Sequence, residues 1–251
     1  MSTRNPSPPS ENSSSIKQAD QIGDTVYSKR WLFSLLIDLL KLLDQASGIP
    51  DTVEELDTDL EDRLCCLWDL TINRDVLPYL DDFDLVSVLS DALVCQRYPR
   101  LLEITVGILA NMAFDATACQ KMSENNTFIN RILFLFYSRD TPTLTEVCRL
   151  LQTVLASIDH SAAWFTAIKF QSDFIDNLLF ILKESTNDNL LMASIRLLDA
   201  VTRGDDSLAE VWCGCELLEA ILIAQHEMSW LHGSEVEIIH RLLYTFSSNT
   251  T

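Results

Sequence analysis

Cysteine and histidine are the residue types in this sequence that could hold a metal ion or assist catalysis. The chain has seven cysteines and four histidines. Cys213 and Cys215 have the spacing of half a zinc site, but a second pair is missing and the histidines show no ligand spacing. Most of the cysteines lie in apolar helical patterns, so we interpret them as small core residues in a reducing compartment. We therefore expect no metal and no cofactor.

A catalytic site would require a nucleophile beside a base, a glycine-rich phosphate loop or a metal cluster. The sequence has no glycine-rich loop, and His160 and His240 each stand alone in a helical pattern. A single histidine in such a pattern is more often a surface residue or a hydrogen-bonded core residue than a catalytic one. These observations predict a protein that is not an enzyme.

The charge balance narrows the class of partner. The 37 acidic residues outnumber the 18 basic residues, which gives a formal net charge of -19. This charge repels nucleic acids and anionic membranes and favours a basic protein partner. The sequence between Ser47 and Asp62 is dense in carboxylates. We interpret it as a solvated loop or the polar start of a helix, with docking of a basic partner as the alternative.

The sequence also predicts a soluble intracellular chain. Its start is polar and lacks the apolar run of a secretory signal. The longest apolar segments, Trp31 to Leu43 and Ile132 to Tyr137, are too short to span a bilayer. Residues 1–24 are rich in Ser, Pro and Asn and are predicted to form a disordered tail, so that the folded domain occupies residues 25–251.

Polar side chains recur at one position of four long apolar segments. These side chains are Asp69, Asn111, Thr153 and Asp199, at intervals of 42, 42 and 46 residues. A helical period of about 40 residues is typical of armadillo and HEAT repeats, so we predict an all-α, armadillo/HEAT-like helical repeat solenoid. In armadillo proteins the equivalent asparagine lines a concave groove and binds the backbone of an extended peptide. We predict that this polar column forms a protein-binding groove; the alternative is that it bonds to neighbouring backbone and holds adjacent repeats in register.

Nuclear-import receptors of this class carry tryptophans one helical turn before the asparagine, where the rings flank lysine side chains. The matching positions here are Cys65, Gly107, Arg149 and Ile195, and Trp68 is out of phase with this row. The sequence therefore argues against recognition of basic import signals.

Long helices are needed to position the polar column. Their shared apolar pattern runs from Leu64 to Asp75, Val106 to Thr117, Cys148 to Asp159 and Ser194 to Asp205, with a weaker fifth copy from Arg241. Shorter helices are predicted between them, at residues 84–94, 128–137, 174–182 and 217–224. Each unit should be a helical hairpin that is stabilised mainly by its neighbours, at roughly 1.5–3 kcal/mol per buried leucine.

Two residues mark the starts of predicted helices. Ser28 is a good N-cap for an amphipathic helix that continues to Leu43, which we expect to cover the first end of the domain. Pro99 suits the first position of a helix because it has no amide hydrogen to lose. The stretch from Tyr98 to Met122 is predicted to form one mostly buried helix.

Several short segments match a known family. They are Asn5-Pro6-Ser7-Pro8-Pro9, Ile22-Gly23, Thr25-Val26-Tyr27-Ser28-Lys29, Trp31-Leu32-Phe33, Trp68-Asp69, Pro99-Arg100-Leu101, Glu103-Ile104, Val106-Gly107-Ile108-Leu109 and Asn111-Met112-Ala113. With these segments the chain resembles the serum amyloid A-like family, also called the synoviocyte proliferation-associated proteins. The resemblance is close over roughly the first half of the chain and looser over the second.

The resemblance implies an armadillo-type fold, a nuclear location with the cytoplasm as a second compartment, and a non-enzymatic role in promoting cell proliferation of the synovial fibroblast type. Family members are longer, so we expect a short isoform, a divergent member or a truncated product. The resulting hypothesis is a protein-interaction scaffold whose partner is a protein with an extended or basic segment. The alternative is a regulatory subunit or assembly chaperone for a basic protein client.

Overall fold

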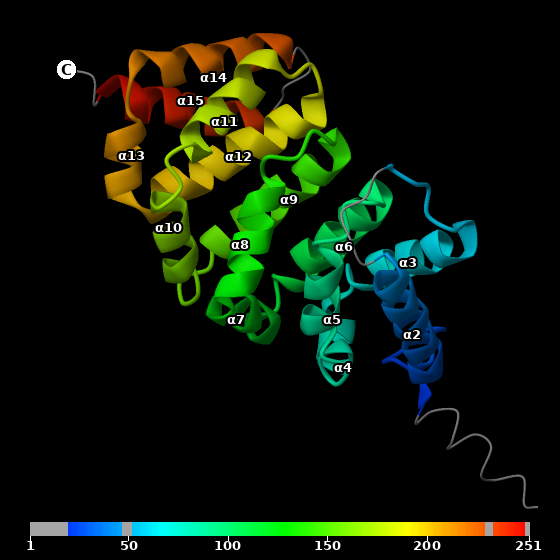
Figure 1. Ribbon diagram of the computed structural model, residues 1–251. Coiled ribbons are helices and arrows are strands. Elements are labelled where there is room, and N and C mark those ends of the chain that lie inside the picture. Colours follow the sequence, from blue (N-terminus) through cyan, green and yellow to red (C-terminus); the bar gives the residue numbers. More distant parts are fainter. Residues whose placement is uncertain (1–19, 47–51, 229–232, 249–251) are drawn as a thin grey trace, which may run out of the picture.

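The computed structural model describes residues 20–46, 52–228 and 233–248. Within these ranges the fold is all-helical, which confirms the predicted class, and an isolated bridge joins Gln21 to Ser28. The helices stack in chain order, so that α2 and α15 lie toward opposite ends of the molecule (Figure 1). Their bounds are α2 (Lys29–Gln45), α3 (Thr58–Leu70), α4 (Leu77–Asp81), α5 (Leu85–Ala92), α6 (Pro99–Met112), α7 (Ala116–Glu124), α8 (Asn126–Leu135), α9 (Thr141–Leu155), α10 (Ala162–Lys169), α11 (Phe174–Glu184), α12 (Asp188–Gly204), α13 (Asp206–Trp212), α14 (Cys215–Glu227) and α15 (Ser234–Ser248), with a short 3-10 helix at Arg74–Val76.

Helix starts follow local capping chemistry. Ser28 accepts a hydrogen bond from the amide of Trp31, and Asp57, Asp140 and Asn187 cap α3, α9 and α12 in the same way. Pro99 occupies the first turn of α6. The described part of the predicted acidic segment is a non-helical stretch at residues 52–56, followed by the cap Asp57 and the start of α3; residues 47–51 lie outside the described residues.

The repeat unit differs from the predicted hairpin. A short third helix follows each of α6, α9 and α12, namely α7, α10 and α13. The predicted single helix from Tyr98 to Met122 is wrong because Asp115 interrupts it: its carboxylate accepts from the amide of Ala118 at 3.0 Å and caps α7. Each unit therefore contains three helices, two short and one long.

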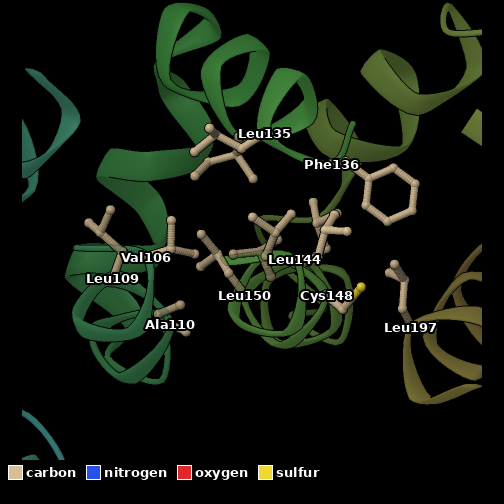
Figure 2. Packing of buried hydrophobic residues seen from close by; sticks show 14 of the residues in the cluster. Val106, Leu109, Ala110, Leu135, Phe136, Leu144, Cys148, Leu150 and Leu197 are labelled. Carbon is tan, nitrogen blue, oxygen red and sulfur yellow. The ribbon is translucent and has the colours of Figure 1, made fainter. Parts of the chain in front are cut away.

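One hydrophobic cluster extends through the stack, from Ile22 to Phe246. In Figure 2, Val106 and Leu109 of α6 lie on one side of α9, and Leu197 of α12 lies on the other side, near Cys148. Because α9 contributes buried side chains to both neighbours, each repeat is stabilised by the units beside it. Burial raises the pKa of the Cys148 thiol to about 12, as expected for a cysteine that is part of the core.

The domain begins before its predicted start. Ile22 is fully buried, and its amide donates to the carbonyl of Tyr27 at 3.0 Å. The predicted boundary between residues 24 and 25 therefore lies inside an ordered turn, since a single buried apolar residue holds a segment that is polar on average. Residues 1–19 of the predicted tail lie outside the described residues.

In the described part of the chain, we find no helix whose length and hydropathy would let it cross a lipid bilayer.

Candidate protein-interaction surface

Asn111 links three long helices. Its Nδ2 group donates to the carbonyl of Trp68 at 3.2 Å and to the hydroxyl of Thr71 at 3.1 Å, both at the end of α3. Its Oδ1 atom accepts from Nη1 of Arg149, on α9, at 2.7 Å. Both ends of the amide are thus bonded within the protein, to the helices on either side of α6.

Asp199 forms the corresponding contact at the other end of the stack. Its side chain is only 4% exposed, and Oδ1 accepts from Nε and Nη2 of Arg241, on α15, at 2.8 and 2.7 Å. Arg203, one turn later on α12, lies 3.0 Å from Oδ2. Hydrogen bonds between charged groups are stronger than neutral ones, so this cluster fastens α15 to α12.

The other two residues of the polar column have different surroundings. The hydroxyl of Thr153 donates within its own helix, to the carbonyl of Arg149 at 2.9 Å. Asp69 is exposed on α3. A hydrogen bond with Cys66, burial and the charges of Cys66 and Asp69 together raise the pKa of Tyr27, so Asp69 lies near the N-terminal segment.

The structure therefore joins Asn111 to the Thr153 helix through Arg149 and to the end of the Asp69 helix through Trp68 and Thr71. Asp199 instead pairs with arginines of α12 and α15. The contacts of Asn111 and Asp199 fit the alternative in which polar side chains hold adjacent repeats in register. The peptide-binding role of the column stays a prediction.

Arginines that bond across neighbouring repeats were not recognised as contacts from the sequence. Nη2 of Arg149 donates to the carbonyl of Gly107 at 3.0 Å. Arg100 of α6 pairs with Glu61 of α3 at 2.8 Å and with Glu103 of its own helix at 2.7 Å. An arginine inside an otherwise apolar frame is the signal that could have identified these contacts, because its charge must find a partner.

Glu146 of α9 takes part in the same set of charged contacts. Its carboxylate pairs with Arg149, and burial together with the nearby charge of Glu103 raises its pKa against the opposing effect of Arg149. Arg100, Glu103, Glu146 and Arg149 therefore form a chain of charges along α6 and α9, each with a partner inside the protein.

Gly107 shows why one of the import-receptor positions has no room for a tryptophan here. A Cβ atom at this glycine would lie 2.1 Å from Cζ2 of Trp68. The indole of one repeat thus packs directly on the backbone of the next, and a larger residue at position 107 would displace it.

Exposed aromatic rings form a second candidate surface, on the short helices. Phe134 of α8, Tyr137 just after it and Phe180 of α11 are 60%, 40% and 64% exposed. We call these three residues the aromatic row. Phe134 and Tyr137 line a hollow of about 460 Å³. Tyr137 and Phe180 line a neighbouring hollow of about 640 Å³. The two hollows share Tyr137, so the row is continuous.

The chain is similar to curated proteins over most of its length. It is 41% identical over 212 residues to Protein saal1 of Danio rerio and 33% identical over 202 residues to Protein SAAL1 of Homo sapiens. These alignments cover 83% and 78% of this chain but 45% and 43% of the two relatives, so the chain spans less than half of their length. Residues 174–251 match the family model of the SAAL1 C-terminal domain, in the half where the sequence resemblance is looser.

Two solved structures share the fold. They are engineered proteins from the Northeast Structural Genomics Consortium, with TM-scores of 0.57 and 0.53 and sequence identities of 16% and 14%. The superpositions cover 84% of this chain and 97% and 99% of those chains. At such identities the similarity concerns the fold alone.

Proposed function

This chain belongs to the SAAL1 family, and we propose that it is a non-enzymatic, armadillo-type scaffold that binds a partner protein. Units of three helices support the armadillo assignment, since armadillo and HEAT repeats consist of two or three helices over about 40 residues. By the resemblance described above, the proposal extends to a nuclear location and to the promotion of cell proliferation.

The aromatic row is the observation that carries the proposal. Phe128 and Phe174 are fully buried, and six residues later in each helix Phe134 and Phe180 are exposed. The same large apolar side chain therefore faces solvent at equivalent positions of two consecutive repeats. Exposed apolar patches of this kind mark interaction sites on soluble proteins.

Affinity purification from cells tests the proposal. The test variant combines Phe134→Ser with Phe180→Ser, and the matched control is Phe170→Ser, whose ring is 86% exposed after α10 and outside the row. Surface substitutions of this kind change stability by about 0.5 kcal/mol or less, so all three proteins should melt at similar temperatures. We expect the wild type and the control to retain at least one partner that the double variant loses. Identical sets of bound proteins for all three would refute the aromatic row as the interaction surface.

A regulatory subunit or assembly chaperone for a basic client is the second candidate function. The observation that favours it is the net charge of -19. Binding that depends on charge weakens when salt screens it, because the Debye length falls from about 10 Å at 0.1 M to about 3 Å at 1 M ionic strength. Loss of the partner in high salt with no effect of the double variant would favour this function over the aromatic row.

A further inference from the structure

The outer faces of α11 and α14 carry the same arrangement of charge and apolar surface. On α11 the residues Asp176, Phe180 and Glu184 follow one another at intervals of four, and on α14 the residues Glu219, Ile223 and Glu227 do the same. This spacing places each set on one face of its helix. All six side chains are exposed. We call the two sets together the acid-flanked stripe.

The two halves of the stripe lie side by side. α11 and α14 are adjacent in the stack (Figure 1). Lys183, one residue before Glu184, pairs with Glu216 at 2.9 Å and lies 3.8 Å from Glu219. Ile223 lines an open hollow of about 590 Å³ with Leu218 and Leu222.

The charge of this surface is largely uncompensated. Asp176, Glu184 and Glu227 form no ion pair with any residue that the structure describes. Asp173 and Asp176 both contribute, after burial, to raising the pKa of Tyr137, so the negative potential reaches the aromatic row. Lys183 and His226 are the basic residues of α11 and α14. A bound segment would therefore meet apolar surface bordered by negative charge.

We propose that the outer face of α11 and α14 binds a basic amphipathic helix of another protein. The proposal rests on the proposed scaffold function and names the chemistry of its partner. Apolar side chains of that helix fill the hollows beside Phe180 and Ile223, and its lysines and arginines pair with Asp176, Glu184 and Glu227. The match is one of charge complementarity, since an apolar helix face flanked by positive charges is the counterpart of an apolar surface flanked by carboxylates.

Binding of a synthetic peptide to the full chain tests the proposal. The probe is a fluorescent peptide of about 18 residues whose leucines recur at helical spacing and whose remaining positions are lysine and alanine. One control peptide has glutamate in place of lysine, and a second has the same composition in scrambled order. Fluorescence anisotropy reports the dissociation constant for the wild type and each variant.

Two pairs of protein variants separate this surface from general charge attraction. Asp176→Asn, Glu184→Gln and Glu227→Gln together are compared with Asp75→Asn, Asp159→Asn and Glu210→Gln, which change the net charge equally at exposed positions elsewhere. Phe180→Ser is compared with Phe170→Ser.

We expect the stripe variants to bind the lysine peptide about tenfold more weakly and the control variants to bind it as the wild type does, because only the stripe variants remove charge pairs or apolar contacts with the peptide. The two control peptides should bind the wild type at least about tenfold more weakly than the lysine peptide does.

Equal losses for the stripe triple and the control triple would overturn the proposal, because they would show attraction by net charge alone. Stronger binding of the glutamate peptide would also overturn it. Self-association of the chain that Phe180→Ser abolishes, measured by analytical ultracentrifugation, would identify a second copy as the occupant and overturn the basic helix. A different outcome is that the cellular partners are still lost with the Phe134→Ser, Phe180→Ser variant while the lysine peptide binds the stripe variants as tightly as the wild type. In that case the scaffold function stands and the basic partner is refuted.

Discussion

Replacing Asp199 with alanine should loosen the last helix of the described stack. The substitution removes a carboxylate that is 4% exposed and that joins Arg241 of α15 to Arg203 of α12. Two hydrogen bonds, at 2.8 and 2.7 Å, and an ion pair at 3.0 Å are lost at once. Since this cluster spans the α12–α15 junction, the effect should be largest at α15.

The magnitude follows from what remains after the substitution. Removing one partner of a buried ion pair costs about 3–5 kcal/mol when the other charge stays buried. Here the two arginine side chains are 47% and 60% exposed, so water can solvate them after the carboxylate is gone. We therefore expect Asp199→Ala to lower the free energy of unfolding by about 2–3 kcal/mol, and the melting temperature by about 4–12 °C for a chain of this size. Asp199→Asn keeps an acceptor and should cost about 1 kcal/mol.

Urea unfolding followed by circular dichroism measures the change, and a double-mutant cycle with Arg241→Ala isolates the pair. The coupling free energy should be at least about 1 kcal/mol. In hydrogen exchange, Asp199→Ala should speed the exchange of amides in α15 relative to the wild type, and should change the exchange of amides in α6 less. Thr153→Ala is the control from the same column, because its hydroxyl bonds only within its own helix.

A change of less than about 0.5 kcal/mol, or a coupling free energy near zero, would refute the interpretation of Asp199 as an inter-repeat contact. That result would favour the groove prediction instead, since a carboxylate that does not stabilise the fold is available to bind a partner. The combined alanine variant of Asp69, Asn111 and Asp199 separates the two roles in the same way: a structural column loses stability, whereas a binding groove loses its partner at unchanged melting temperature.

Three further outcomes follow from single residues. Gly107→Ala should lower the free energy of unfolding by about 1–3 kcal/mol in a urea titration, because the new methyl group would lie 2.1 Å from the ring of Trp68, and Trp68→Leu should relieve the loss. Thr105→Val should raise the melting temperature, with a gain of about 1 kcal/mol, because the buried hydroxyl of Thr105 lacks a hydrogen-bond partner among the described residues; a lower melting temperature would contradict this. Burial raises the pKa of Cys148 to about 12, so its stabilising contribution should be present below pH 9 and fall between pH 9 and 12 as the unfolded chain loses the proton first. Urea midpoints of the wild type and Cys148→Ala, compared at pH 8 and pH 10, should therefore converge, and parallel curves would contradict the shift.

The sequence predicted the helices and their period because the responsible forces are local. The caps Ser28 and Asn187 and the proline at position 99 act within one helical turn, and the apolar pattern of each long helix repeats about every 40 residues. The family resemblance was confirmed by the curated relatives. The third helix after α6 was missed because only three residues, Ala113, Phe114 and the cap Asp115, separate α7 from α6, without glycine or proline.

Only the tertiary structure decided what the polar and aromatic residues contact. The pattern placed Asn111 at an interior position, but the carbonyl of Trp68 and the guanidinium of Arg149 that bond to it lie 43 and 38 residues away and depend on the stacking register. Likewise, Phe174 and Phe180 belong to one apolar helix, and only the position of the neighbouring helices buries the first and exposes the second. Local periodicity determines which residues share a helix face, whereas packing between repeats determines whether that face meets another helix or solvent.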